Sequence, residues 1–330
     1  MKPWPIVGHQ WAARQLQLAL ESGEVPHALL ITGPESIGKH TLAETFVAAL
    51  LCRSADDKPC GDCLSCRKLR SGNHPDFMLV EPDDRAARLR IDPIRQLEQF
   101  LMLTPRESLR KVALLGAFER ATVSAANALL KTLEEPPAYA HLILLATDAD
   151  LLLPTIVSRT QQINLRPLSA GQVSEALVAR WGVDAETAHR LARLSGGRLG
   201  WAVQAATSPE TYERMHTALE TLIDLLRKDL PERFEVARAL ARDDAQLLET
   251  FEVWSTFWRD VLMLQTASGE MVTHAEHRDI LATLASSTAL DETVRVLTTL
   301  EAAQAALLAN ANTQLLVENL LLDLPTIRWG

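Results

Sequence analysis

The chain has 330 residues, 47% of them hydrophobic, and a formal net charge of −9 at pH 7. This length predicts about two to three domains with sizeable cores, and the acidic balance argues against a protein whose whole surface binds nucleic acid. The longest apolar runs, 46–52 and 141–146, are too short to cross a membrane, and the first residues lack the apolar segment of a signal peptide. We therefore expect a soluble, cytoplasmic protein.

Residues 1–166 alternate short apolar runs with helical patterns. The expected strands are 28–32, 77–80, 112–115, 141–146 and 161–165. The helices expected between them include 9–21, 39–52, 91–101 and 122–134. This alternation predicts an α/β domain in which a mostly parallel sheet carries helices on both faces.

A phosphate-binding loop pattern joins the first expected strand to the helix that follows it. Gly33, Gly38 and Lys39 supply its two glycines and its lysine, and backbone N–H groups and the helix dipole would meet a phosphate there. The hydroxyl residue that should come next and bind magnesium is replaced by His40. ATP binding is therefore doubtful: the loop either binds nucleotide weakly or is vestigial.

The four cysteines of the chain, Cys52, Cys60, Cys63 and Cys66, have the spacing C-x7-C-x2-C-x2-C. Overlapping C-x2-C steps let several thiolates converge on one ion, and four thiolates close a tetrahedral zinc site with no position for water. We predict a structural zinc in a module at about 52–66. The alternatives are free thiols, an iron–sulfur cluster and a disulfide, which a reducing compartment disfavours.

The expected strand 112–115 lacks the acids that end the corresponding strand of an ATPase. It is followed by Gly116 and Ala117, and Glu119 lies too far along the chain. With His40, this predicts a nucleotide-binding scaffold that lacks the groups required for hydrolysis.

From residue 167 onward the pattern is helical. Ser169 and Gln172 form a capping-box signature before a helix at 173–181, and short helices are expected at 185–194 and 199–206. Beyond residue 208, apolar residues recur at spacings of three and four, which predicts longer helices. Two interpretations stay open: these helices pack on neighbouring subunits, or they form an ordinary helical core.

Several segments together resemble one family. The run 130–137 (Leu-Lys-Thr-Leu-Glu-Glu-Pro-Pro) and the later Ser-Arg-Thr at 158–160 resemble the AAA+ clamp-loader family of DNA replication. The cysteine insertion, the segment 73–76 and the segment 91–95 resemble its bacterial branch. The resemblance covers essentially the whole chain and implies an AAA+ P-loop domain at 1–166, a small helical lid domain at 167–207 and an all-helical collar domain at 208–330.

The resemblance also implies a function. The chain would be one subunit of a hetero-pentameric ring within the DNA polymerase III holoenzyme, a DNA-directed DNA polymerase. Its partners would be ATPase subunits of the gamma/tau type, a delta-type subunit, the sliding clamp and primer-template DNA. The absence of acids after the expected strand 112–115 resembles a family subunit that lacks ATPase activity of its own.

Two arginines gain roles from the resemblance. In ATPase subunits of the family, the arginine of a Ser-Arg-Cys sequence reaches into the ATP site of the neighbouring subunit. Ser158 and Arg159 match this sequence, while Thr160 replaces the cysteine, so the resemblance implies that Arg159 is an arginine finger in trans; the alternative is a solvated surface arginine. Arg198 lies near the second sensor of the family, and a nucleotide contact or a surface charge both stay open.

Two other classes are weighed against this interpretation. An active ATPase subunit of the same loader is disfavoured by His40 and Gly116. An autonomous zinc-containing DNA-binding protein is disfavoured by the acidic balance and by the absence of a basic stretch interleaved with aromatic residues.

Overall fold

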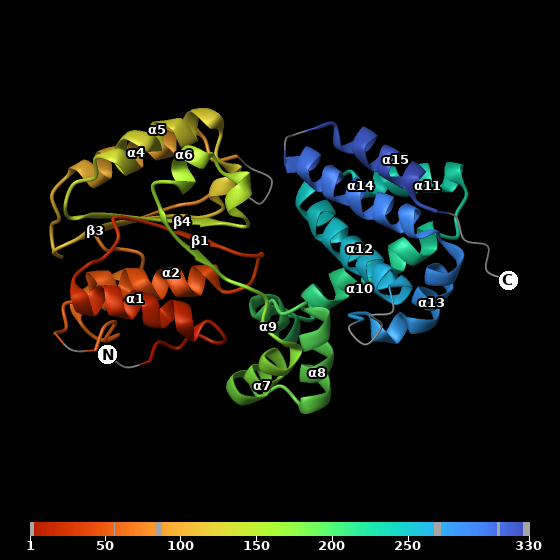
Figure 1. The fold of residues 1–330 in the computed structure, drawn as a ribbon, viewed down its shortest axis with the longest axis horizontal. Helices are drawn as coiled ribbons and strands as arrows, with labels where there is room; N and C mark the ends of the chain where they lie inside the picture. Colours follow the sequence, from red (N-terminus) through yellow and green to blue (C-terminus); the bar gives the residue numbers. More distant parts are fainter. Residues whose placement is uncertain (1–2, 56, 83–87, 267–271, 309–310, 326–330) are drawn as a thin grey trace. The chain divides into compact units, whose positions relative to one another are not determined.

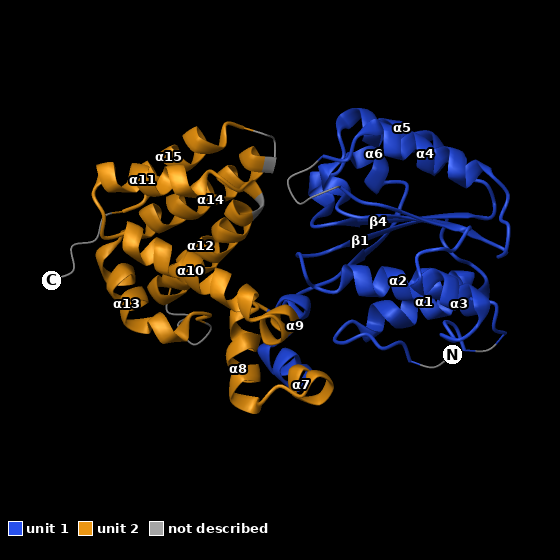
Figure 2. Cartoon of the chain, turned by 180° about the vertical axis from the view of Figure 1, so that it is seen from behind, with its two compact units in different colours: residues 1–83, 87–176, 197–201 blue, residues 84–86, 177–196, 202–330 orange. Residues whose placement is uncertain are grey.

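The computed structural model describes residues 3–55, 57–82, 88–266, 272–308 and 311–325. The chain divides into two compact units (Figure 2). Unit 1 comprises Met1–Asp83, Ala87–Ala176 and Gly197–Trp201, and unit 2 comprises Asp84–Ala86, Leu177–Gly196 and Ala202–Gly330. Residues 167–207, expected to form one small domain, are shared between these units, and the division into three domains stays a prediction.

Unit 1 is built around a five-stranded parallel sheet. Its strands are β1 (Ala28–Thr32), β2 (Phe77–Val80), β3 (Lys111–Leu115), β4 (Ala140–Ala146) and β5 (Gln161–Asn164), in the order β2-β3-β4-β1-β5. Strands β1, β3 and β4 are buried along their whole length, as expected for parallel strands covered on both faces. The five predicted strands are confirmed to within one residue at each end.

Helices cover both faces of this sheet (Figure 1). On one face lie α1 (Gln10–Ser22) and α2 (Lys39–Leu51), and on the other lie α4 (Ile91–Met102), α5 (Val123–Glu134) and α6 (Pro154–Val157). Unit 1 therefore has two hydrophobic cores, one between the sheet and α1 and α2, the other between the sheet and α4, α5 and α6. Because side chains alternate along a strand, Leu29 and Ile31 pack into the former, while Ala28 and Leu30 pack into the latter.

Three short elements complete unit 1. The helix α3 (Leu64–Arg70) lies within and just after the cysteine module, and single 3₁₀ turns occupy η1 (Phe118–Arg120) and η2 (Ala149–Leu151). The short helices α3 and α6 were not among the predicted helices. The predicted helices 9–21, 39–52, 91–101 and 122–134 correspond to α1, α2, α4 and α5.

The remaining elements are helical. They are α7 (Ala170–Trp181), α8 (Ala185–Leu194), α9 (Leu199–Thr207), α10 (Pro209–Leu225), α11 (Leu230–Leu240), α12 (Asp244–Gln265), η4 (Ala275–His277), α13 (Arg278–Ser287), α14 (Leu290–Leu308) and α15 (Thr313–Asp323). The predicted capping box at α7 is formed: Gln172 N–H donates to Ser169 Oγ at 3.2 Å, and Ser169 N–H donates to Gln172 Oε1 at 3.0 Å. Among the described residues, no helix combines the length and apolarity needed to cross a membrane.

A buried arginine ties together the helix ends of unit 2. Arg233 of α11 is only 2% exposed. Its guanidinium donates to five carbonyl oxygens at distances from 2.6 to 3.2 Å, those of Leu225, Lys228, Leu321, Leu324 and Pro325. The last carbonyls of a helix lack intrahelical partners and carry partial negative charge. One side chain therefore satisfies the carboxyl ends of both α10 and α15.

Candidate functional site

The predicted phosphate loop follows the carboxyl end of β1 and leads into α2. Gly33 has a φ of +144°, and a Cβ at this position would lie 2.5 Å from the carbonyl oxygen of Leu165. Gly38 has a φ of +110° and directly precedes Lys39, the first residue of α2. Both positions require glycine, so the backbone keeps the shape that the sequence pattern predicts.

The ammonium group of Lys39 is turned toward its own loop. The residue is only 8% exposed. Its Nζ donates to the carbonyl oxygen of Gly33 and, at 2.9 Å, to that of Pro34. Burial lowers the pKa of Lys39, although the charges of Glu119 and Glu35 oppose this shift. The lysine that would meet a phosphate is thus engaged by the loop itself.

The acidic side chain that follows β2 lies beside Gly116, where an active ATPase would carry an acid. Glu81, which follows β2, has its Oε1 atom 3.5 Å from Nδ1 of His40. A Cβ built on Gly116 would lie 2.5 Å from the same oxygen. Glu81 therefore fills the space that an acidic side chain at residue 116 would take. The neutral or charged imidazole of His40 is a poor substitute for a hydroxyl toward the hard Mg²⁺ ion.

A second acid lies inside the phosphate loop. Glu35 accepts a hydrogen bond from Nη2 of Arg120 at 3.3 Å. A carboxylate within the loop is unfavourable for a bound anion, and here its charge is balanced by Arg120. Sequence analysis missed Glu35, Glu81 and Arg120; only Glu35, an acid within a phosphate-loop pattern, carried a local signal.

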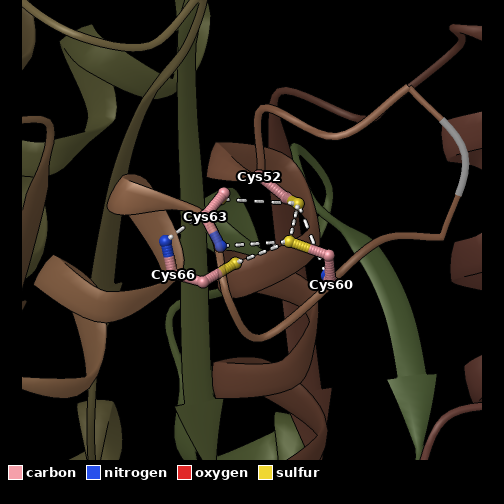
Figure 3. Close-up of side chains that lie close together, drawn as sticks. All are labelled: Cys52, Cys60, Cys63 and Cys66. Atoms are coloured by element: carbon pink, nitrogen blue, oxygen red, sulfur yellow. Dashed lines mark hydrogen bonds between the residues drawn. The ribbon is translucent and has the colours of Figure 1, made fainter.

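The four cysteines lie together as predicted (Figure 3), and their sulfur atoms all lie within 4.8 Å of one another. Cys52 Sγ is 3.6 Å from Cys60 Sγ and 4.0 Å from Cys63 Sγ, and Cys60 Sγ is 4.0 Å from Cys66 Sγ. Four sulfurs bound tetrahedrally to zinc at about 2.3 Å would be about 3.8 Å apart. The separations fit zinc ligation, and they are far longer than a disulfide bond of about 2.05 Å.

Backbone N–H groups in the cysteine cluster favour thiolates. The N–H groups of Cys60, Cys63 and Cys66 each donate at 3.4 Å to the sulfur of the preceding cysteine. Burial would raise the pKa of the Cys63 thiol, but backbone and side-chain hydrogen bonds outweigh it and lower the pKa to about 6. Burial raises the pKa of Cys66. A metal ion would supply the positive charge that holds all four sulfurs deprotonated.

A buried hydrogen-bond chain connects the cysteine module to the sheet. Ser65 Oγ donates to the carbonyl oxygen of Leu51 at 2.6 Å and lies 2.7 Å from Nε2 of His74. Because the hydroxyl proton is already used, Nε2 must donate to Ser65. Nδ1 of His74 accepts from the N–H of Asp76 at 3.1 Å. The imidazole of His74 is thus held neutral, with its proton on Nε2.

Protonation of His74 should oppose folding. Burial lowers its pKa below the ordinary 6.5, so the unfolded chain takes up a proton at a higher pH than the folded chain. The stability contributed by neutral His74 is complete above pH 6.5 and is lost as the pH falls toward the folded-state pKa. We expect the free energy of unfolding to decrease in this window, by at most about 1.4 kcal/mol per pH unit for one proton.

Urea unfolding at several pH values measures this slope. His74→Asn should make the slope shallower, whereas the same substitution at the exposed His189 should leave it unchanged. Identical slopes for the wild type and His74→Asn would contradict the assignment.

Arg159 and the phosphate loop lie at opposite ends of the strands of the sheet. Gln161, two residues later, begins β5 and pairs with Leu29 near the amino end of β1. The phosphate loop instead follows Thr32 at the carboxyl end of β1. Five strand residues span about 13 Å, so the guanidinium of Arg159 is out of reach of the phosphate loop of its own chain.

The side chain of Arg159 is 36% exposed and is held by neighbouring groups. Its Nη2 lies 2.6 Å from Oε1 of Glu134, at the end of α5. Its Nη1 donates to the carbonyl oxygen of Thr155 at 3.0 Å and to Ser158 Oγ at 3.4 Å. Sequence analysis singled out the run that contains Glu134 but did not assign this residue a contact with Arg159.

Arg198 directly precedes α9, whose start lies against the phosphate loop. The N–H of Gly200 donates to the carbonyl oxygen of Ser36 at 2.8 Å. The start of α9 therefore lies beside the phosphate loop, and the role of Arg198, a nucleotide contact or a surface charge, stays a prediction.

The fold and the glycine-lysine loop define the chain as an AAA+-type P-loop α/β protein with a helical C-terminal region. The sequence model of one family, described as DNA polymerase III, delta subunit, matches residues 8–169, and the model of the C-terminal part of the delta subunit matches residues 209–326. The chain belongs to this family of DNA polymerase III subunits.

Two individual relatives, both delta' subunits, agree with this assignment. The chain is 42% identical over 193 residues to DNA polymerase III subunit delta' of Pseudomonas aeruginosa, a match that covers 58% of this chain and 56% of the relative. It is 27% identical over 311 residues to DNA polymerase III subunit delta' of Bacillus subtilis, covering 93% of each chain. A solved gamma subunit-related protein of Thermotoga maritima matches 93% of this chain and 97% of its own, with 20% identity and a TM-score of 0.45.

Proposed function

We propose that the chain is a clamp-loader subunit of the delta' type. It has no ATPase activity of its own and supplies Arg159 to the ATP site of a neighbouring subunit while the complex loads a sliding clamp onto primed DNA. Its partners are the ATPase subunits and a delta-type subunit, and it works in the cytoplasm as part of the polymerase holoenzyme.

The separation of Arg159 from the phosphate loop carries this proposal. The arginine lies near the amino ends of β1 and β5, at the opposite end of these strands from the phosphate loop. A guanidinium is permanently charged and forks onto two phosphate oxygens. A nucleotide bound by a neighbouring subunit that faces this end of the sheet would give the half-exposed Arg159 a second anionic partner beside Glu134, and phosphate oxygens suit its chemistry.

The contacts around the phosphate loop support the absence of hydrolysis in cis. Lys39 donates to its own loop, and Glu35 is paired with Arg120. Glu81 brings one carboxylate to the space beside Gly116, but its neighbour there is His40. No hydroxyl therefore stands at residue 40 to bind Mg²⁺ beside an acid, as an active P-loop site requires.

We expect the isolated chain to show no magnesium-dependent ATP hydrolysis above background. Restoring the strand-end acid alone, as Gly116→Asp, should not create activity, because Glu81 already fills that space and His40 offers no hydroxyl to the metal. A coupled phosphate-release assay measures both proteins. Turnover that disappears in Lys39→Ala would contradict the proposal and support an active ATPase subunit instead.

The cysteine cluster is proposed to hold one structural zinc ion. Cys52, Cys60, Cys63 and Cys66 would provide the complete ligand set, which leaves no open position for water or substrate. The metal would therefore stabilise the module and take no part in chemistry.

Reconstitution separates the proposed function from an autonomous DNA-binding protein. We propose mixing the chain with the other loader subunits, measuring the mass of the product by size-exclusion chromatography with light scattering, and assaying clamp-stimulated ATP hydrolysis with and without the chain. A stoichiometric assembly with increased hydrolysis supports the proposal. A chain that stays separate and binds DNA alone would contradict it.

A further inference from the structure

A carboxylate from a neighbouring helix holds the guanidinium of Arg159. Oε1 of Glu134 lies 2.6 Å from Nη2 of Arg159, a short separation typical of a charge-assisted hydrogen bond. The two residues lie 25 positions apart in sequence, on α5 and just after α6. The pair is therefore a product of the packing of α5 against α6 rather than of local sequence.

The position of Glu134 is fixed by the way α5 ends. Pro136 and Pro137 cannot continue a helix, and the N–H of Glu135 makes the last helical bond, to the carbonyl oxygen of Lys131 at 3.1 Å. Glu134 is consequently the last residue of α5. A carboxylate at a helix C-terminus is repelled by the helix dipole, and the charge of Arg159 offsets this repulsion.

Two further groups approach the guanidinium, one from α6 and one from the residue that follows it. The carbonyl oxygen of Thr155 and Oγ of Ser158 both accept from Nη1, while Glu134 accepts from Nη2. These contacts engage three of the five N–H donors of a guanidinium. Thr155 and Ser158 fix the position of Nη1. Glu134 binds Nη2 and so sets the rotation of the guanidinium plane about Nη1.

We propose that Glu134 is a positioning residue for Arg159: it holds the guanidinium plane in the orientation that meets the phosphate oxygens of a nucleotide bound by the adjacent subunit. This inference rests on the proposed role of Arg159 in trans. Half-exposed ion pairs contribute little to folding stability, so the effect of Glu134 should be on catalysis rather than on folding.

The test uses the assembled loader, with clamp and primed DNA present and the other ATP sites disabled. Glu134→Gln should lower kcat for ATP hydrolysis about tenfold with little change in KM, since misplacing a catalytic group by a fraction of an ångström costs rate more than binding. Glu134→Asp, which keeps the charge, should recover part of the loss. Glu135→Gln is the matched control, with the same charge change one residue away at an exposed position, and it should behave as the wild type.

Combining the variants separates the two proposals. If Glu134 acts through Arg159, then Glu134→Gln should cause no further loss in a chain that already carries Arg159→Ala. The positioning role is overturned if Glu134→Gln turns over as fast as the wild type while Arg159→Ala is slow, or if it causes the same loss with and without Arg159. If Arg159→Ala itself retains full activity, both the proposed role of Arg159 in trans and the positioning role of Glu134 are contradicted. Thermal unfolding of Glu134→Gln should match that of the wild type, and a large decrease would indicate a structural role instead.

Discussion

Replacing Arg159 with alanine should reduce ATP hydrolysis at the neighbouring subunit's site by on the order of a thousandfold, the effect expected for loss of an arginine finger. In the proposed role, the substitution removes a charge that would meet the γ-phosphate as negative charge develops there. Folding and assembly should be preserved, because the side chain is 36% exposed and lies outside the two cores of unit 1. Arg159→Lys should restore little activity, since an ammonium keeps the charge but loses the planar fork.

The measurement needs a loader in which the other ATP sites are disabled, because sites that hydrolyse independently would mask a loss at one interface. Arg166→Ala is a suitable control, since it removes the same charge from an exposed position just after β5. Equal rates for Arg159→Ala and the wild type would show that Arg159 is only a surface arginine.

Removal of the proposed zinc ion should change the structure of the cysteine module. Without zinc, the four sulfurs would be brought together with no ion to neutralise their charge, so we expect the module around 52–66 to unfold. Zinc contributes about 10–16 kcal/mol of apparent binding free energy in small zinc-dependent domains. The loss here should be smaller, because the buried residues that form the two cores of unit 1 lie outside 52–66.

Elemental analysis of protein purified without chelator should find about one zinc per chain, and Cys63→Ser or chelator treatment should lower the melting temperature. Chelator should have no further effect on a variant that no longer binds metal. A fully folded, metal-free protein obtained without chelator would contradict the assignment.

Much of unit 1 could be predicted from sequence because its strands have strong local signals. The uninterrupted apolar run of β4 predicts a buried strand, and the spacing of Gly33 and Gly38 predicts the loop; each pattern is contained within a few residues. The helix α6 has only four residues, fewer than needed to show a helical period, and α3 lies among cysteines that obscure any apolar pattern.

The interactions around the candidate site could not be predicted, because they join distant residues. Arg120 and Glu35 are 85 positions apart, and no periodicity relates Glu81 to His40 or Glu134 to Arg159. The location of Arg159 relative to the phosphate loop depends on the pairing of β5 with β1. Sequence predicts that both strands exist, but their adjacency and register are decided by packing in three dimensions.

The contacts of Arg233 give the last turn of α15 an unusual thermodynamic property. The last turn of a helix ordinarily frays, opening at little free-energy cost. Opening the last turn of α15 would strip Arg233 of the carbonyl oxygens of Leu321 and Leu324 and leave a buried cation without those acceptors. We therefore expect the opening of α15 to be coupled to that of α11, so that the two helices unfold as one cooperative unit although residues 241–312 separate them in the chain.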